Sequence, residues 1–214
     1  MFFTLDGVDG VGKSTQGRLF CEWLREAGHE VTACRDPGST EVGEAIRQIL
    51  LDGKNTALHR RAEMLLYMAA RAQLVEEVIA PALAAGRVVV SDRYLLANVV
   101  YQGHAGGLDV DELWRIGQIA TAGVAPDMTF LLDMPPEAAR SRLDRALDRM
   151  EQQPTEFRLR LRQGFLDEAA RRSEIVVIAA DRPVEAVQTE IRSAASRVLK
   201  DSSTATPSSR RVKP

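Results

Sequence analysis

Apolar residues along the chain alternate between short continuous runs and longer segments with a helical spacing. The short runs are typical of buried parallel strands, and they span residues 2–6, 30–35, 87–92, 128–133 and 174–179. The longer segments have the spacing of one helical face, and they span residues 15–27, 40–51, 56–85, 95–102, 110–122, 136–147, 156–172 and 184–199. Alternating strands and helices predict an α/β fold, with a central parallel sheet of about five strands and helices on both faces.

Two stretches interrupt this pattern. Residues 148–155 form a polar break between two predicted helices. Residues 201–214 are rich in Ser, Thr and Pro and have no apolar period, so we expect a disordered C-terminal tail. A chain of 214 residues is long enough for one domain with a substantial core, and we predict this domain over residues 1–200.

Composition narrows the classes of protein to consider. The formal net charge of -2 argues against a general nucleic-acid binder, which would usually be basic. No apolar run reaches membrane-spanning length, and the first predicted strand begins without a signal peptide before it. Cys21 and Cys34 lack metal-ligand spacing, which indicates buried thiols in a reducing compartment. We therefore expect a cytoplasmic protein that binds neither nucleic acid nor membrane.

The most specific motif lies between the first predicted strand and the first predicted helix. Residues 7–14 read G-V-D-G-V-G-K-S, a complete phosphate-binding loop pattern in the strand–loop–helix context that it requires. Glycines let backbone N–H groups turn toward a polyphosphate, and the helix N-terminus adds partial positive charge there. The candidate triphosphate-binding residues are Gly7, Val8, Asp9, Gly10, Val11, Gly12, Lys13, Ser14 and Thr15.

Three side chains near this loop suggest how a nucleotide and its metal ion would be held. Lys13 would reach the β- and γ-phosphates, and the hydroxyl of Ser14 would ligate Mg²⁺. Asp92 closes the third predicted strand, and its carboxylate could hold the same ion or its water shell. Ser14 and Asp92 are thus the candidate metal ligands.

The loop alone does not decide between GTPases, ATPases and small-molecule kinases. The guanine-reading segment N-K-x-D of signalling GTPases does not occur in the chain. A motor or transporter ATPase would normally be larger. A kinase needs an acceptor phosphate site beside the first site, and three further segments look like one.

These acceptor-site candidates follow two predicted strands and lie on the long predicted helix. Residues 35–40 read R-D-P-G-S-T at the carboxyl end of the second strand, where ligands of parallel sheets gather. Arg93 follows the third strand, and arginine offers a fork of donors that suits phosphate. Tyr67 and Arg71 lie side by side on the helix, which suits a pyrimidine base. The alternatives are a capped turn, a salt-bridged loop, and a core tyrosine beside a surface arginine.

Together the motifs resemble the thymidylate kinase family over about residues 1–200. Asp9 in the glycine loop belongs to the pattern. The other matching segments are R-D-P-G-S-T at 35–40, Y-M-A-A-R-A-Q at 67–73, S-D-R-Y at 91–94, N-V-V-Y-Q-G at 98–103 and L-D-R-M-E at 147–151. The resemblance implies a P-loop NTPase fold, a homodimer, and transfer of phosphate from ATP to dTMP with Mg²⁺. The alternatives are another nucleoside monophosphate or deoxynucleoside kinase, or an inactive nucleotide-binding module.

The resemblance also implies where the phosphate and the sugar of dTMP would bind. Arg35 and Arg93 would grip the phosphate. Asp9 would contact the sugar 3′-hydroxyl, and Tyr101 would lie against C2′ and disfavour ribose. These assignments place the acceptor directly beside the glycine loop.

At the base end, the resemblance assigns three more residues. Tyr67 occupies the position of an aromatic residue, usually Phe, that stacks on thymine. Arg71 would hydrogen-bond O4 of the base, and Asn98 would read its edge. The family implies a cis peptide bond before Pro37, and Ser39 replaces the usual second glycine of that segment.

One departure concerns the transition-state arginine. Gly10 stands where some members place a catalytic arginine, so the chain looks like the bacterial type, whose arginine comes from a lid, here about residues 140–153. Arg149 is favoured because D-R-M-E matches the family, and Arg142 and Arg145 are the other candidates. The alternative is that these arginines are solvated and paired with neighbouring acidic residues. The predicted catalytic residues are Lys13, Asp92, Arg93, Arg142 and Arg149.

Overall fold

The structure is a computed structural model that describes residues 1–53, 58–143, 149–150 and 152–204. Within these residues, five parallel strands form a sheet in the order β2-β3-β1-β4-β5. The strands are β1 (Phe2–Asp6), β2 (Val31–Arg35), β3 (Val88–Asp92), β4 (Met128–Asp133) and β5 (Ile175–Ala179). The predicted α/β fold with a parallel sheet is confirmed, and the strand bounds lie within one residue of those predicted.

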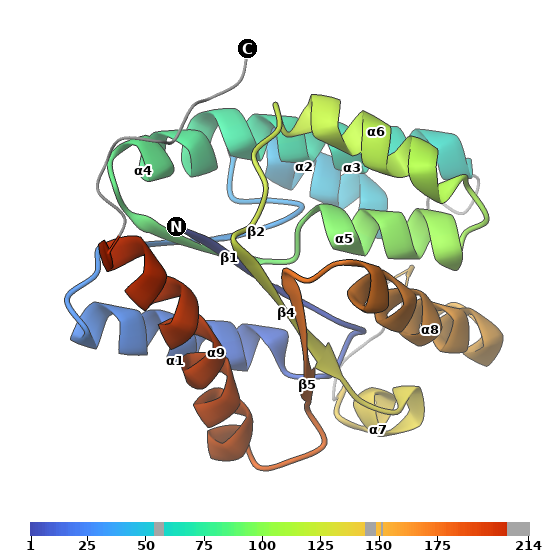
Figure 1. Cartoon of the computed structure of the whole chain (residues 1–214). Coiled ribbons are helices and arrows are strands. Elements are labelled where there is room, and N and C mark those ends of the chain that lie inside the picture. The colour runs from blue at the N-terminus through green and yellow to red at the C-terminus, as the bar shows by residue number, and fades with distance from the viewer. Residues whose placement is uncertain (54–57, 144–148, 151, 205–214) are drawn as a thin grey trace.

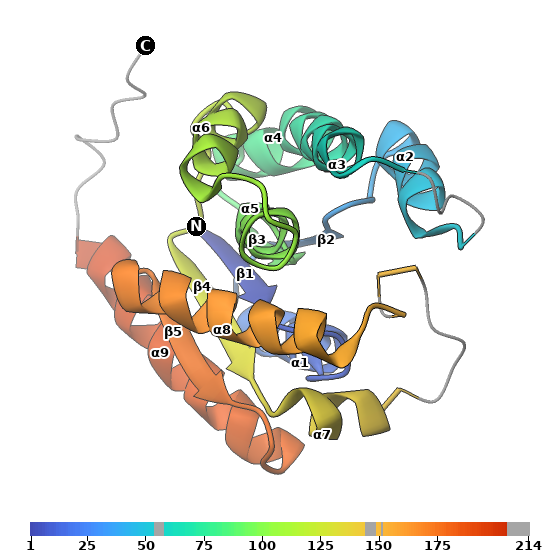
Figure 2. The ribbon, with the colours of Figure 1, turned by 90° about the vertical axis from the view of Figure 1, so that its right-hand side faces the viewer.

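Helices cover both faces of this sheet (Figure 1, Figure 2). They are α1 (Lys13–Glu26), α2 (Glu41–Leu51), α3 (Arg60–Leu74), α4 (Ala80–Ala84), α5 (Leu95–Asn98), α6 (Val110–Ala120), α7 (Pro136–Ser141), α8 (Thr155–Arg171) and α9 (Val184–Thr204), with the π-helical segments η1 (Val75–Ile79) and η2 (Val99–His104). α1 and α9 pack on each other against one face, and α3 to α6 cover the other. In this part of the chain, no helix is both long and apolar enough to cross a membrane.

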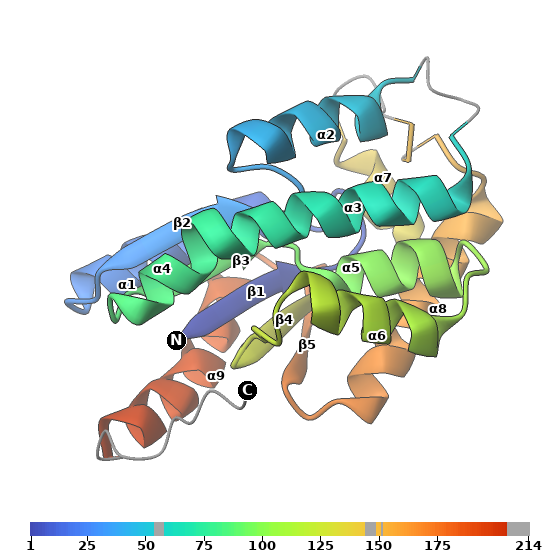
Figure 3. The same cartoon turned by 90° about the horizontal axis from the view of Figure 1, so that it is seen from above.

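The long helix predicted over residues 56–85 is divided in the structure. α3 begins at Arg60 and continues through η1 into α4, which contains Pro81. Proline has no N–H, and its ring clashes with the carbonyl four residues earlier in an ordinary helix. The N–H of Ala80 donates to the carbonyl of Val75 instead. This wider turn lets α3 continue into α4 despite the proline (Figure 3).

β1 lies in the middle of the sheet and is buried on both faces. Successive side chains of a strand point to opposite faces. Phe3 therefore packs on one side, with its ring centroid 5.3 Å from that of Phe20 and 5.9 Å from that of Phe130. Phe2 packs on the other side, 4.9 Å from the ring of Tyr94. The strand that leads into the glycine loop is thus anchored to both helical layers.

A pair of buried glutamines ties α1 to α9. The amide nitrogen of Gln188 donates to the backbone carbonyl of Gln16 at 3.0 Å and to its side-chain oxygen at 2.9 Å. The amide nitrogen of Gln16 donates to the carbonyl of Val184 at 3.0 Å. Because Gln16 lies in the first turn of α1, the C-terminal helix braces the helix that follows the glycine loop.

Two helix ends differ from the prediction. α7 ends at Ser141 rather than at residue 147, and residues 144–148 lie outside the described residues. α9 continues to Thr204, so the predicted tail of residues 201–214 begins inside a helix. Once a helix is nucleated, each added residue gains a backbone hydrogen bond, so α9 extends beyond its apolar pattern. Residues 205–214 lie outside the described residues.

Candidate active site

The glycine loop between β1 and α1 closes around the side chain of Lys13. The Lys13 ammonium donates to the carbonyl oxygens of Gly7 at 3.1 Å and Val8 at 2.9 Å. Gly10 has a φ of 89°, and a Cβ at this position would lie 2.0 Å from the Ala139 carbonyl oxygen. Only glycine fits both the backbone conformation and the contact with α7. The loop therefore holds a buried cation directly after β1.

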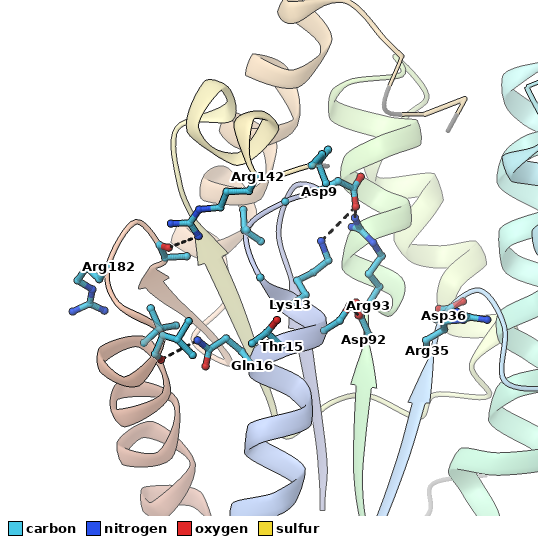
Figure 4. A pocket seen from close by; sticks show the side chains of 18 of the residues that line it. Asp9, Lys13, Thr15, Gln16, Arg35, Asp36, Asp92, Arg93, Arg142 and Arg182 are labelled. Atoms are coloured by element: carbon cyan, nitrogen blue, oxygen red, sulfur yellow. Dashed lines mark hydrogen bonds and ion pairs between the residues drawn. The ribbon is translucent and has the colours of Figure 1, made fainter. Parts of the chain in front are cut away.

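A cavity of about 510 Å³ opens over this loop (Figure 4). Its lining includes the predicted triphosphate-binding residues from Asp9 to Thr15, whereas Gly7 and Val8 do not line it. Among the described residues, its arginines are Arg35, Arg47, Arg93, Arg142 and Arg182. A cavity with this many cations suits a polyphosphate, since guanidinium groups pair well with phosphate oxygens.

Asp6 and the two predicted metal ligands meet at the carboxyl ends of β1 and β3. The hydroxyl of Ser14 donates to a carboxylate oxygen of Asp92 at 2.7 Å. Both carboxylate oxygens of Asp6 are buried without a hydrogen-bond partner. Burial raises the pKa of Asp6 to about 7, although the positive charges of Arg93 and Lys13 act in the opposite direction.

The oxygen set at this place fits Mg²⁺. The Ser14 hydroxyl and the Asp92 carboxylate are oxygen ligands, which hard cations prefer. Within the described part of the chain, no group of three or more His, Cys, Asp or Glu could form a metal cage. Mg²⁺ does not need one, because it keeps several waters and takes one or two protein oxygens beside substrate phosphates.

Arg93 stands at the carboxyl end of β3 in a left-handed backbone conformation, with a φ of 69°. Its guanidinium donates to a carboxylate oxygen of Asp9 at 2.5 Å and to the hydroxyl of Tyr101 at 3.2 Å. The Tyr101 hydroxyl donates to the other Asp9 oxygen at 3.0 Å. Burial acts to raise the pKa of Asp9, but the positive charges of Arg93 and Lys13 outweigh it and hold this pKa well below its usual range.

A second pocket, of about 70 Å³, adjoins the first cavity. Both are lined by Asp9, Asp36, Arg47 and Arg93. The smaller pocket also contains four of the residues predicted to bind dTMP, namely Tyr67, Arg71, Asn98 and Tyr101. The structure therefore brings six of the seven predicted acceptor residues together, and the seventh, Arg35, lines only the larger cavity.

The inner end of the smaller pocket is a buried polar edge. The Arg71 guanidinium donates to a carboxylate oxygen of Asp36 at 2.5 Å and to the side-chain oxygen of Asn98 at 3.0 Å. The Asn98 amide nitrogen donates to the side-chain oxygen of Gln102 at 2.6 Å. The Asp36–Pro37 peptide bond is cis, as the resemblance implied.

The guanidinium of Arg35 is held by an acidic side chain of α2. It donates to both carboxylate oxygens of Glu44 at 2.8 Å. Its side chain is half-exposed at the rim of the larger cavity. In this arrangement the guanidinium contacts Glu44 rather than the smaller pocket.

The lid candidates separate into two groups. Arg142 lines the larger cavity and donates to the carbonyl of Ala180 at 3.2 Å. Arg149 instead donates to the carbonyl of Leu50 at 2.9 Å and forms an ion pair with the buried carboxylate of Glu63. Arg149 does not line the larger cavity. Arg145, the third candidate, lies outside the described residues.

Arg47 and Gln102 are among the pocket residues that sequence reasoning missed. Arg47 shares one helical face of α2 with Gly43 and Leu50, which are both buried, and that spacing was the available signal. Gln102 lies within the N-V-V-Y-Q-G segment, four residues after Asn98. Two amides at that spacing on a helix are neighbours, so the pair could have been found from the sequence.

Comparisons with known proteins point to one family. The family model described as thymidylate kinase matches residues 5–191. A thymidylate kinase of Clavibacter sepedonicus is 47% identical over 199 residues, which are 91% of this chain and 94% of that protein. One of Rhodopirellula baltica is 48% identical over 165 residues, 77% of this chain and 67% of that protein.

The solved structures include a similar protein. The crystal structure of thymidylate kinase from Ehrlichia chaffeensis aligns with a TM-score of 0.76 and 28% sequence identity, and the match covers 92% of this chain and 98% of that one. The fold is thus that of a P-loop NTPase. With the family model and the relatives agreeing over most of its length, the chain belongs to the thymidylate kinase family.

Proposed function

We propose that this kinase transfers the γ-phosphoryl group of ATP to dTMP, with Mg²⁺, and releases ADP and dTDP. The observation that carries the proposal is the pair of adjoining cavities, which share Asp9, Asp36, Arg47 and Arg93. A polyphosphate in the larger cavity and a monophosphate in the smaller pocket would meet at these residues. Phosphoryl transfer depends mainly on such positioning and on neutralising charge, so no covalent enzyme intermediate is needed.

In the donor half, the loop from Gly7 to Thr15 is proposed to hold the ATP phosphates. The Lys13 ammonium donates hydrogen bonds to the carbonyls of Gly7 and Val8, and it would turn to the β- and γ-phosphates when they are present. Ser14 and Asp92 would hold Mg²⁺. When bound, that ion neutralises phosphate oxygens and orients them for in-line attack.

In the acceptor half, two arginines are proposed to bracket the dTMP phosphate. Arg93 and Arg47 line both cavities and so lie where the two phosphates would meet. The role proposed for Arg35 requires its bidentate pair with Glu44 to open. Burial lowers the pKa of Arg47, because a desolvated cation is costly, and an incoming phosphate dianion would relieve that cost.

The sugar and the base are proposed to lie deeper in the pocket. Asp9 would accept a hydrogen bond from the sugar 3′-hydroxyl, and the Tyr101 ring would exclude a ribose 2′-hydroxyl. Tyr67 would stack on the base, while Arg71 and Asn98 would read its polar edge. The buried edge of donors and acceptors favours a pyrimidine with a fixed hydrogen-bond pattern over another nucleoside monophosphate.

The proposed lid, about residues 140–153, contributes in two places. Arg142 is the described lid arginine that lines the donor cavity. A transition-state role for Arg149 would require it to leave Glu63. Residues 144–148 and 151 of this segment lie outside the described residues.

We further propose that the protein acts as a homodimer in the cytoplasm. Leu65 on α3 and Ile119 on α6 are 55% and 83% exposed, and the two helices pack against each other. Exposed apolar side chains on adjoining helices suit a self-complementary interface. Cys21 and Cys34 are free thiols, which suits a reducing compartment.

The proposal is tested by measuring ADP release with dTMP, dUMP, dCMP, AMP and thymidine as acceptors. We expect dTMP to be preferred, and Lys13→Ala to remove nearly all turnover while the melting temperature changes little. Turnover with AMP equal to that with dTMP would favour another monophosphate kinase. ATP binding without turnover on any acceptor would indicate an inactive nucleotide-binding module.

A further inference from the structure

Glu63 on α3 is a completely buried carboxylate that the proposed mechanism does not use. One of its oxygens accepts a hydrogen bond from the amide nitrogen of Gln102 at 2.8 Å and lies 3.5 Å from the Arg60 guanidinium. The other oxygen pairs with Arg149. Burying a carboxylate costs free energy because it loses its hydration. The partners of both Glu63 oxygens must offset that cost, and they show what the residue holds in place.

Through Gln102, this carboxylate ends a chain of buried hydrogen bonds that runs along the smaller pocket. Arg71 donates to Asn98, Asn98 donates to Gln102, and Gln102 donates to Glu63. Each of the four is at most 2% exposed. The chain begins at a guanidinium, which can only donate, and ends at a carboxylate, which can only accept.

These two ends fix the direction of the amides between them. An amide has one donor end and one acceptor end, so a chain of amides can run either way when its ends permit. Here Glu63 can only accept, and the amide nitrogens of Gln102 and Asn98 must both face toward it. The donor and acceptor pattern on this edge of the pocket is therefore set by both ends, and Glu63 is the end that lies outside the pocket lining.

Through Arg149, the same carboxylate also holds one wall of the pocket. Arg149 is anchored to Glu63 and to the carbonyl of Leu50, at the C-terminal end of α2. The next residue, Met150, is 5% exposed and lines the smaller pocket. Glu63 thus contacts both the polar edge of the pocket and the residue beside its apolar wall.

We propose that Glu63 is a positioning residue for base selection, which anchors the far end of the Arg71–Asn98–Gln102 edge and holds Met150 against the acceptor. This inference rests on the proposed function, because it takes the smaller pocket to be the dTMP site. Thymine and cytosine present opposite patterns at their N3 and at their 4-substituent. The Glu63 carboxylate would therefore favour thymine over cytosine without contacting either base.

The test compares two buried carboxylates. Glu63→Gln keeps the shape of the side chain but removes the charge that holds Gln102 and Arg149. Glu168→Gln is the matched control. Glu168 is 1% exposed and accepts from Arg172 and Trp114 at 3.0 and 3.1 Å, and it does not line either pocket.

The readout is kcat/KM for dTMP and for dCMP, together with KM for ATP. Hydrogen bonds to charged groups are worth enough for roughly a tenfold effect. We therefore expect Glu63→Gln to raise KM for dTMP about tenfold and to lower the dTMP-to-dCMP ratio by about as much, with KM for ATP unchanged. Glu168→Gln lowers the melting temperature but leaves the ratio as in wild type.

The outcomes separate this inference from the proposed function. A wild type that shows no preference for dTMP removes the proposed function itself. If wild type prefers dTMP, and Glu63→Gln loses stability as Glu168→Gln does without changing the ratio, then Glu63 is only structural. Should Glu63→Gln not fold, the charge-neutral double variant Glu63→Gln with Arg149→Gln carries the same expectation for the ratio.

Discussion

Asp6 ends β1 with both carboxylate oxygens buried and unpartnered, and its pKa is raised to about 7 by that burial. In the unfolded chain the carboxyl has its ordinary pKa of 3.8. The folded protein therefore keeps a proton that the unfolded chain releases as the pH rises from 4 to 7. The stabilisation by this group is complete below pH 4 and is lost as the pH rises through 7.

Asp6→Asn should remove this pH dependence. As the pH rises from 4 to 7, wild type should lose free energy of unfolding relative to Asp6→Asn. The loss should be up to about 1.4 kcal/mol per pH unit. Urea unfolding of both proteins from pH 4.5 to pH 8 measures it. Curves that stay parallel would show that Asp6 is ionised in the folded state throughout this range.

At the residue scale, the sequence indicated the residues whose chemistry is local to one motif. Lys13 and Ser14 could be named because the glycine loop positions them by itself. Glu63 could not, because its importance comes from elements distant in sequence, namely η2 and the residues around Arg149. The Arg35–Glu44 pair was also hidden, since a β-strand residue and a helix residue meet only in the fold.

Two helical glycines differ in the space around them, and this decides what a methyl group would do. A Cβ at Gly17 of α1 would lie 3.7 Å from the nearest atom, on Leu5, which is an ordinary contact. A Cβ at Gly117 of α6 would lie 2.3 Å from a methyl carbon of Leu95. Gly117 is therefore where α6 packs closely on α5.

Alanine should act in opposite directions at the two positions. Gly17→Ala should stabilise by about 0.5–1 kcal/mol, because alanine loses less backbone entropy in a helix. Gly117→Ala should destabilise by about 1–3 kcal/mol through overpacking. Chemical denaturation compares each variant with wild type. A stabilised Gly117→Ala would mean that Leu95 moves aside without cost.

At the element scale, periodicity found the strands better than it found helix ends. A buried parallel strand is a short apolar run with clear limits, and all five were read within one residue. The end of α9 lies among polar residues, where the backbone continues a helix that side chains no longer mark. The π-helical turn before Pro81 leaves no periodic signal in the sequence, because it forms where the proline lacks a backbone N–H.

For the whole molecule, the exposed side chains of α3 and α6 provide a test of the proposed dimer. Ile119→Lys should convert a dimer into a monomer, because an interface would have to bury the new charge. Val177→Lys is the matched control, since Val177 is an apolar residue 41% exposed on β5. Light scattering measures the mass of each protein. A Val177→Lys protein that dissociates while Ile119→Lys stays dimeric would move the interface to the β5 side.

The overall architecture was the most predictable level, because alternating strands and helices leave few arrangements for a parallel sheet. The strand order was harder, since it depends on which strands pair. β1 lies between β3 and β4, so its partners come from distant parts of the chain. The joining of the two cavities follows from that order and from the loops after β1, β2 and β3.

The tie between Gln16 and Gln188 joins residues 172 positions apart, and this has a consequence for how the protein is made. During synthesis on the ribosome, α1 emerges early, but its partner helix α9 emerges much later. At translation rates of about 5–20 residues per second, the delay is roughly 10 to 30 seconds. We expect nascent chains stalled before α9 to hold nucleotide poorly, so catalytic competence would arrive only with that helix.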